Sequence, residues 1–228
     1  MSVLSQFVVP AQLMEVSFMA TSSVVVDRRD FYEVLGRVQA VVTSRRLWVS
    51  LSGVRLGTSG DRLLLAGTDG ETTLTTWVEA KGYLPSCVVS CAELVRCIKT
   101  SKDDTCTLSM RTHPSRLVVL VRGVEHELSF MLKVDSFSFP KRQGGGTITL
   151  DAEEFRTGLA VTSHAVAREP SRYAINGVLL ESDADGVRLV ATDGQRLVIT
   201  ELRPYETGFQ GRVILPSRVA RLIKRFVN

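Results

Sequence analysis

The stretch Leu189-Val190-Ala191-Thr192-Asp193-Gly194 repeats an earlier one, Leu65-Ala66-Gly67-Thr68-Asp69-Gly70, which lies 124 positions upstream. The similarity extends to both sides, so that residues 24–72 and 148–196 align without a gap. A period of this length is too long for a solenoid repeat. The sequence therefore predicts a duplicated domain.

Each copy is expected to open with a short strand, Ser23–Val26 or Thr147–Leu150, followed by a helix. Asp27 and Asp151 lie where an N-cap belongs, with an acidic residue three positions on, as in a capping box. Three strands should follow, and the Asp-Gly pair supplies the tight turn before the last of them. The expected strands are Leu51–Leu56, Leu63–Gly67 and Thr72–Val78 in the first copy, and Gly177–Glu181, Val187–Ala191 and Arg196–Glu201 in the second.

A second helix is predicted in both copies, at Cys91–Lys99 and at Ser217–Phe226. Only the first copy continues, with strands expected at Thr105–Met110, Arg116–Val121 and Glu125–Leu132. Amphipathic helices of this kind must cover a sheet with their apolar side. The pattern predicts an α+β fold of duplicated β-α-β-β-β units, with the helices on one face of antiparallel sheets.

The expected organisation has three parts. Residues 1–22 form an extension, either disordered or upstream of a true start at Met19. Residues 23–143 form a first domain, and residues 147–228 form a second, incomplete one after the linker Gly144-Gly145-Gly146. The second domain is expected to lack its last three strands.

The composition permits a polyanionic partner, and a cytoplasmic location is expected. The chain is 44% hydrophobic and carries a net charge of +4, which permits such a partner without demanding one. No stretch reaches the roughly 20 apolar residues of a membrane span. The first 22 residues contain no Lys or Arg, which argues against a secretory signal. The four cysteines lack the paired spacing of a zinc site and are expected to be reduced and buried.

Catalytic interpretations find little support. Asp69 and Asp193 are equivalent across the repeat, so they are not a paired acid and base of one site. The three histidines show no ligand spacing with the cysteines, and the glycine run precedes a strand, unlike a phosphate loop. We expect no catalytic residue, no metal and no cofactor.

Two motifs resemble a known family. They are Ser171-Arg172-Tyr173-Ala174-Ile175-Asn176-Gly177-Val178-Leu179-Leu180-Glu181 and Val190-Ala191-Thr192-Asp193-Gly194-Gln195-Arg196-Leu197. This combination resembles the bacterial sliding clamps, the β subunits of DNA polymerase III, and the similarity covers about residues 24–228. The resemblance implies a non-catalytic ring of three-domain chains that encircles duplex DNA, with helices lining the hole. Compared with such a three-domain chain, this sequence is expected to lack the third domain.

The resemblance implies a DNA-facing surface on the helices. Arg29 and Arg37 share a stripe of the first helix, and Arg45 lies where the family keeps an arginine near DNA. The last helix carries the remaining cations, which are Arg218, Arg221, Lys224 and Arg225. Such cations would neutralise phosphates without reading bases. Without the resemblance, an ordinary solvated face would be the preferred interpretation.

The resemblance also implies a groove for short peptides from polymerase and clamp-loader subunits. Ile175 and Leu197 would supply its apolar surface. Its polar rim would be formed by Thr192, Gly194 and Arg196, and Arg172 would belong to the same groove. A simple Asp-Gly turn explains Asp193 and Gly194 equally well.

The leading hypothesis is a shortened, sliding-clamp-like processivity factor that tethers DNA polymerase to duplex DNA. The alternative is a clamp fragment that does not encircle DNA and binds clamp-binding peptides or a full clamp. Self-association, or pairing with another clamp chain, is expected in either case, because an incomplete sheet leaves an unpaired edge.

Overall fold

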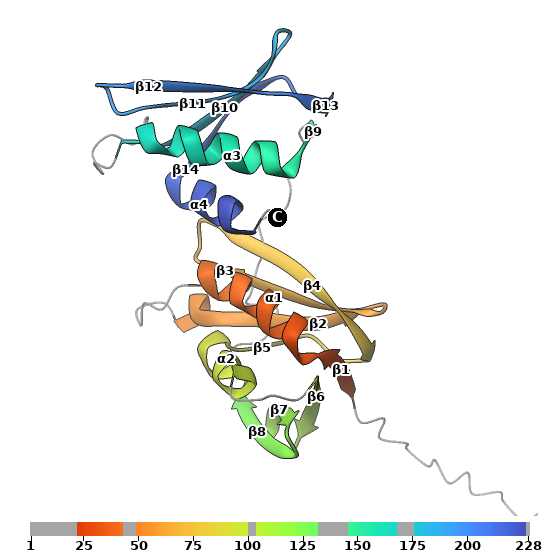
Figure 1. Ribbon diagram of the computed structural model, residues 1–228. Helices are drawn as coiled ribbons and strands as arrows, with labels where there is room; N and C mark the ends of the chain where they lie inside the picture. The colour runs from red at the N-terminus through yellow and green to blue at the C-terminus, as the bar shows by residue number, and fades with distance from the viewer. Residues whose placement is uncertain (1–21, 43–48, 100–103, 132–145, 168–175, 227–228) are drawn as a thin grey trace, which may run out of the picture.

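The computed structural model describes residues 22–42, 49–99, 104–131, 146–167 and 176–226 (Figure 1). The elements up to residue 129 are β1 (Ser23–Asp27), α1 (Arg28–Val41), η1 (Val49–Ser52), β2 (Gly53–Ser59), β3 (Arg62–Thr68), β4 (Thr73–Gly82), β5 (Cys87–Ser90), α2 (Cys91–Lys99), β6 (Thr105–Thr112), β7 (Ser115–Val121) and β8 (Val124–Ser129). The later ones are β9 (Ile148–Leu150), α3 (Ala152–Thr162), η3 (Ser163–Ala165), β10 (Gly177–Asp183), β11 (Gly186–Thr192), β12 (Leu197–Leu202), β13 (Pro204–Thr207), β14 (Gly211–Pro216) and α4 (Ser217–Phe226).

The elements from β1 to β8 form an N-terminal unit around one antiparallel sheet. Its strand order is β5-β2-β3-β4-β1-β6-β7-β8, so β1 lies in the middle and pairs on both edges. The two end strands also meet, because Val89 bridges Phe130 and the N–H of Met131 donates to the carbonyl of Val88 at 2.9 Å. The sheet therefore closes around the core.

The elements from β9 to α4 form a C-terminal unit built on the same plan. Four antiparallel strands pair in the order β12-β11-β10-β14, and β9 pairs separately with β13. Among the residues that the structure describes, nothing pairs with the other edge of β9. In the N-terminal unit the corresponding edge of β1 is taken by β6.

The repeated aspartates perform the same local tasks in both units. Asp27 caps α1 by accepting from the N–H groups of Arg29 and Asp30, at 2.8 and 3.0 Å. Asp151 caps α3 by accepting from the N–H of Glu154 at 2.8 Å. The Glu154 carboxylate does not bond back to the cap; it accepts instead from the N–H of Arg203 at 3.0 Å. The cap is therefore one-sided.

The Asp-Gly turns are also duplicated bond for bond. Asp69 Oδ1 accepts from the N–H groups of Glu71 and Thr72, at 3.0 and 2.7 Å. Asp193 Oδ1 makes the equivalent two bonds, both at 3.0 Å. The following glycine has φ +94° in the first turn and +90° in the second, a conformation that glycine adopts without a steric penalty. This hydrogen-bonded turn explains why the motif recurs.

Two separate hydrophobic clusters mark the two units. In the first, Phe31, Leu35 and Val38 of α1 are fully buried against the sheet. The helix lies close to β3 at Gly67, where an added Cβ would come within 2.6 Å of the side chain of Val38. The second cluster is smaller and has Leu159 and Leu189 at its centre. The domain bounds 23–143 and 147–228 stay a prediction, since part of each bound lies outside the described residues.

The predicted helices and most strands are confirmed. Helix α2 and helix α4 have the bounds expected from the sequence. Three strands were not predicted, namely β5, β13 and β14. Two of these have only four residues, too few to show an alternation of apolar and polar side chains.

Candidate nucleic-acid interface

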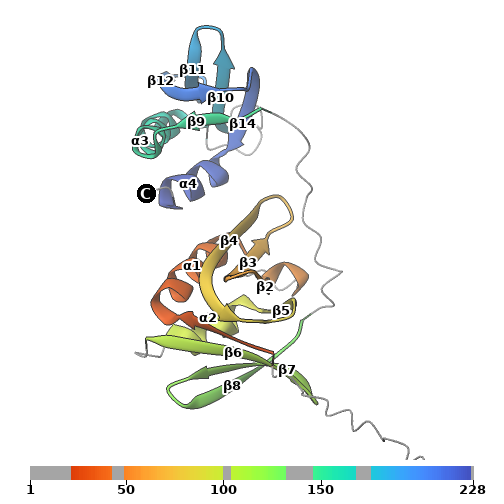
Figure 2. The ribbon, with the colours of Figure 1, turned by 90° about the vertical axis from the view of Figure 1, so that its right-hand side faces the viewer.

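The four α-helices form one continuous row. The order along this row is α2, α1, α4 and α3, and each helix contacts the next. Figures 1 and 2 show the helices following one another from α3 to α2, with β6, β7 and β8 beyond α2. The contact between α1 and α4 joins the two units, so the row continues across the boundary between them.

Helix α4 carries the highest density of positive charge in this row. Arg221 and Arg225 are exposed, and Lys224 is partly exposed. Each of the other three helices includes acidic residues, whereas α4 has none. The guanidinium of Arg225 lies 5.6 Å from the centre of the Phe226 ring, and Arg221 Nε donates to the carbonyl of Ser217 at 3.3 Å. The charged side chains of α4 are therefore all cationic.

Helix α1 is more mixed in charge than expected. Arg29 is exposed in its first turn. Arg37 Nη2 donates to Glu33 Oε1 at 2.7 Å, so part of its charge is compensated within the helix. The family resemblance places Arg45 near DNA, but Arg45 lies outside the described residues.

Arg218 is engaged differently from the other cations of α4. Its Nη2 donates to the carbonyl of Val41 at 2.8 Å, and its Nη1 forms an ion pair with Asp69 Oδ2. Both partners belong to the N-terminal unit. Arg218 was expected to lie with Arg221 and Arg225 on a DNA-facing stripe, but its guanidinium connects the two units.

Two further cations extend the basic surface onto α2. Arg96 and Lys99 are exposed in the last turn of that helix. They occupy the positions equivalent to Arg221 and Lys224, because the second helices of the two copies align at an offset of 125. The repeat itself thus contains the signal that would have identified them.

The expected peptide groove is partly described. Thr192, Gly194 and Arg196 belong to one turn, in which Thr192 Oγ1 donates to the carbonyl of Arg196 at 2.7 Å and accepts from the N–H of Gly194 at 3.1 Å. Arg196 Nε donates to Asp193 Oδ2 at 2.8 Å. Leu197 follows with 60% of its surface exposed. Arg172 and Ile175 lie outside the described residues.

The carboxylate of Asp193 is held in its charged form. The backbone N–H groups of Gln195 and Arg196 are the main cause, and the Arg196 side chain adds to it; together they lower the pKa of Asp193. Arg196 is thus explained by the turn as well as by a groove. The exposed Leu197 is not explained by either the turn or the core.

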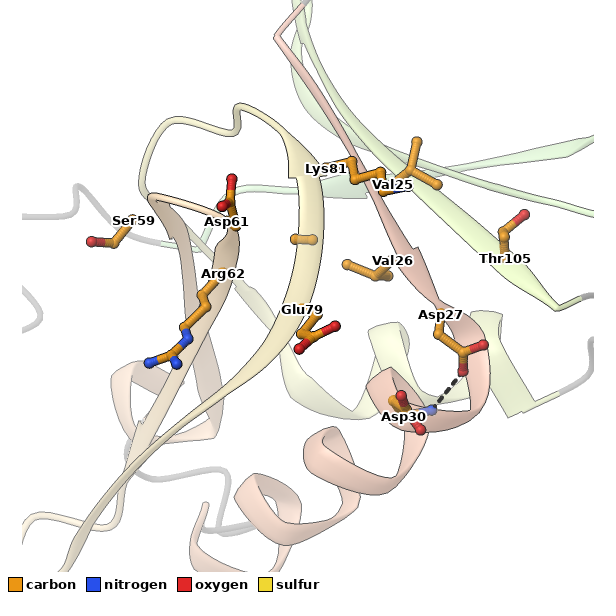
Figure 3. A pocket seen from close by; sticks show the side chains of 11 residues that line it. Val25, Val26, Asp27, Asp30, Ser59, Asp61, Arg62, Glu79, Lys81 and Thr105 are labelled. Atoms are coloured by element: carbon orange, nitrogen blue, oxygen red, sulfur yellow. Dashed lines mark hydrogen bonds between the residues drawn. The ribbon is translucent and has the colours of Figure 1, made fainter.

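A cavity of about 1040 Å³ lies elsewhere in the N-terminal unit, between β1, β4 and the β2–β3 turn (Figure 3). The carboxylates that line it outnumber the cations. They are Asp27, Asp30, Asp61 and Glu79, against Arg62 and Lys81. Asp27 is already occupied as the cap of α1, as the dashed line in Figure 3 indicates. An excess of carboxylates disfavours a phosphate ligand here.

The described residues contain no group of three or more His, Cys, Asp and Glu side chains that could hold a metal ion. Of the helices in the described ranges, none combines the length and apolar character that crossing a membrane requires.

Comparison with known proteins gives a consistent result. Residues 149–228 match the family model described as the central domain of the DNA polymerase III beta subunit. The beta sliding clamp of Pseudomonas putida is 29% identical over 205 residues, which cover 87% of this chain and 56% of that protein. The beta sliding clamp of Chlamydia trachomatis is 28% identical, with 88% and 49% covered. The chain thus spans about half the length of these relatives.

Solved structures agree with the sequence comparison. A beta sliding clamp from Caulobacter crescentus superposes with a TM-score of 0.80 at 25% identity, covering 89% of this chain and 56% of the other. The DNA polymerase III subunit beta of Pseudomonas aeruginosa gives a TM-score of 0.79 at 28% identity, with 90% and 57% covered. The duplicated units, the row of helices and these comparisons together show that this chain is similar, over most of its length, to the bacterial sliding clamps, the beta subunits of DNA polymerase III.

Proposed function

We propose that this chain serves as a processivity factor that tethers DNA polymerase to duplex DNA, with its row of helices facing the duplex. The observation that carries the proposal is the cationic surface of α4, within a row that continues across both units. The similarity to bacterial sliding clamps supports it. The cytoplasm of a bacterium is the proposed location.

The chemistry of this surface suits a contact that ignores sequence. Arginine and lysine side chains neutralise phosphates and release counterions, which supplies affinity but reads no bases. The cations proposed to do this are Arg29, Arg37, Arg96, Lys99, Arg221, Lys224 and Arg225. Arg45 is included on the strength of the resemblance alone.

Reversal of charge on α4 tests the proposal. We expect the variant Arg221→Glu, Lys224→Glu and Arg225→Glu to lose DNA binding at low salt. The matched control places the same three reversals outside the helices, at Lys81, Arg122 and Arg203, and should bind like the parent. For the parent, log K should fall linearly with log salt, by about 0.9 per neutralised phosphate, with no preference for a sequence. Equal losses in both variants would refute a specific role for α4.

Encirclement of DNA is a separate part of the proposal. A closed ring would require this chain to self-associate or to pair with another clamp chain. Retention on circular plasmid, followed by release after linearisation, is the result expected of a ring. Binding that does not depend on circularity would favour the alternative, in which the chain binds DNA or partners without encircling DNA.

The exposed Leu197 supports a second, compatible role as a docking point for clamp-binding peptides of polymerase and clamp-loader subunits. Burying a leucine side chain contributes roughly 1.5–3 kcal/mol. We expect Leu197→Ala to weaken binding of such a peptide accordingly, as measured by calorimetry. Val124→Ala is the control, because Val124 is 52% exposed on β8 in the other unit. Peptide affinity unchanged by Leu197→Ala would locate the groove elsewhere.

A further inference from the structure

A charged contact joins the two units at their boundary, between Arg218 at the start of α4 and the N-terminal unit. Arg218 Nη2 donates to the carbonyl of Val41, the last residue of α1, at 2.8 Å. Arg218 Nη1 forms an ion pair with Asp69 Oδ2 in the β3–β4 turn. One guanidinium thus joins α4 to a helix end and to a turn of the other unit.

The surroundings of Asp69 make this contact hard to replace by water. Only 5% of the Asp69 side chain is exposed, and its Oδ2 atom is buried. Its Oδ1 atom is committed to the two N–H groups of its own turn. The Arg218 guanidinium is therefore the charged partner that compensates Oδ2, and a buried carboxylate oxygen without such a partner is strongly unfavourable.

The partner on α1 is suited to a cation as well. The last carbonyls of a helix have no partner within the helix, and they carry the negative end of the helix dipole. Val41 provides such a carbonyl, and its own side chain is buried. A guanidinium with several N–H donors can bond to this carbonyl and to Asp69 together.

The internal repeat shows that this arrangement is particular to the boundary. Asp193 is the equivalent of Asp69, and its Oδ2 accepts from Arg196 of its own turn. The residue equivalent to Arg196 in the first copy is Thr72, which carries no charge. The first turn therefore lacks the internal arginine, and Asp69 Oδ2 is paired across the boundary instead.

We propose that Arg218 is a positioning residue, which holds α4 against α1 and so keeps the cationic helices aligned, and that it does not contact phosphate. This inference rests on the proposed DNA-binding function. It separates Arg218 from Arg221 and Arg225, with which its helical spacing had grouped it. The Arg218 side chain is 44% exposed, but its guanidinium is paired with Asp69, whereas Arg221 and Arg225 are exposed and form no ion pair with the described residues of the other unit.

The salt dependence of DNA binding distinguishes the two roles. Arg221→Gln removes a phosphate contact, so the slope of log K against log salt should decrease by about 0.9. Arg218→Gln should keep the slope of the parent while lowering K by about tenfold at every salt concentration, in the range found for coupled contacting groups. A slope reduced by about 0.9 in Arg218→Gln would overturn the proposal.

A second measurement needs no DNA. Spin labels at Gln39 in α1 and Glu201 in β12, both exposed, would report the distance between the units in a Cys97→Ser background. Arg218→Gln and Asp69→Asn should each broaden the distance distribution, and the double variant should broaden it no further than either one. Asn keeps the Oδ1 acceptor of the turn, so Asp69→Asn leaves local structure intact.

The positioning role of Arg218 and the proposed DNA-binding function can be refuted independently of each other. A distribution unchanged in Arg218→Gln would overturn the positioning role, whatever the DNA result. If the parent protein bound no DNA, the proposed function would fall, and the distance measurement would still decide whether Arg218 holds the units together.

Discussion

The two units of this chain share a repeated sequence pattern, but several equivalent residues are buried to very different extents in the two units. In the N-terminal unit, β1 lies between two strands and α2 buries Cys91, Leu94, Val95 and Ile98. In the C-terminal unit, β9 pairs on one edge only among the strands that the structure describes, and Ala220 is the one buried residue of α4. The difference lies in β6, β7 and β8, which have no equivalent among the described residues of the C-terminal unit.

The comparison shows that a sequence repeat determines local structure, such as caps and turns, but does not determine how stable each unit is. The N-caps and the Asp-Gly turns are alike in the two units because their bonds are made within a few residues. Burial depends on what covers the helices and is therefore different. A C-terminal unit with an open edge is expected to be the less stable part and to associate through that edge.

Truncation of the paired phenylalanines should give the largest difference between the units. Phe31 is fully buried, whereas its equivalent Phe155 is only partly buried and lines a cavity of about 500 Å³. We expect Phe31→Ala to cost about 3–5 kcal/mol and Phe155→Ala about half as much, because less contact is lost. Urea unfolding followed by circular dichroism measures both.

The leucines one turn further on are the matched control for this comparison. Leu35 and Leu159 are equivalent and both fully buried. Leu35→Ala and Leu159→Ala should therefore cost similar amounts, each about 2–5 kcal/mol. A large difference between these two variants would mean that the units differ in more than burial.

Hydrogen exchange should separate the units next. Amides of β1 and α2 are expected to exchange at least about a hundredfold more slowly than those of β9 and α4, because local opening of poorly covered elements costs little free energy. The measurement requires a verified monomer, since association would cover the edge of β9. Equal protection of α2 and α4 in a monomer would contradict the comparison.

Much of this fold was predictable, and the reasons are local. Helices α2 and α4 were predicted with their bounds because their apolar residues recur at helical spacing over nine residues or more. The short strand β5 was missed because Cys87–Ser90 is a brief buried run that fits a strand or a helix equally well. β13 begins with Pro204 and is mostly exposed, so its sequence resembles a loop.

The candidate site was less predictable than the fold. Helical spacing grouped Arg218 with Arg221 and Arg225, because spacing describes one helix and says nothing of what lies beside it. The partner of Arg218 is Asp69, 149 positions away in sequence, and only the packing of α4 on α1 brings them together. Exposed cations could be predicted from the repeat, but a contact between units could not.

Thiol labelling offers a smaller but independent comparison. Burial raises the pKa of Cys91 and of Cys106 to about 12, so neither should react unless the N-terminal unit opens. Ala220→Cys would place a thiol at a buried position of α4. We expect it to react about tenfold faster or more than Cys106, because α4 opens more readily. Labelling followed by peptide mass spectrometry measures both, with the half-buried Cys97 as a fast reference.

The pH dependence of this labelling adds a check. A thiol that reacts only after opening should follow its pKa in the open state, near 8.5, and not the value near 12 of the folded state. The rate at Cys106 should therefore be half-maximal at about pH 8.5 and level off about one pH unit higher. A rate that kept rising well above that pH would mean that Cys106 reacts without opening.

The smallest expected difference concerns the two helix caps. Asp27 accepts from two backbone N–H groups and Asp151 from one. Replacing a cap by alanine costs about 0.5–2 kcal/mol, so Asp27→Ala should lie toward the upper part of that range and Asp151→Ala toward the lower. Asp27→Asn and Asp151→Asn keep the accepting oxygen and should lose much less. If the asparagine variants lost as much as the alanine variants, the negative charge at the helix N-terminus would matter more than the hydrogen bonds, and the two caps should then be equal in effect.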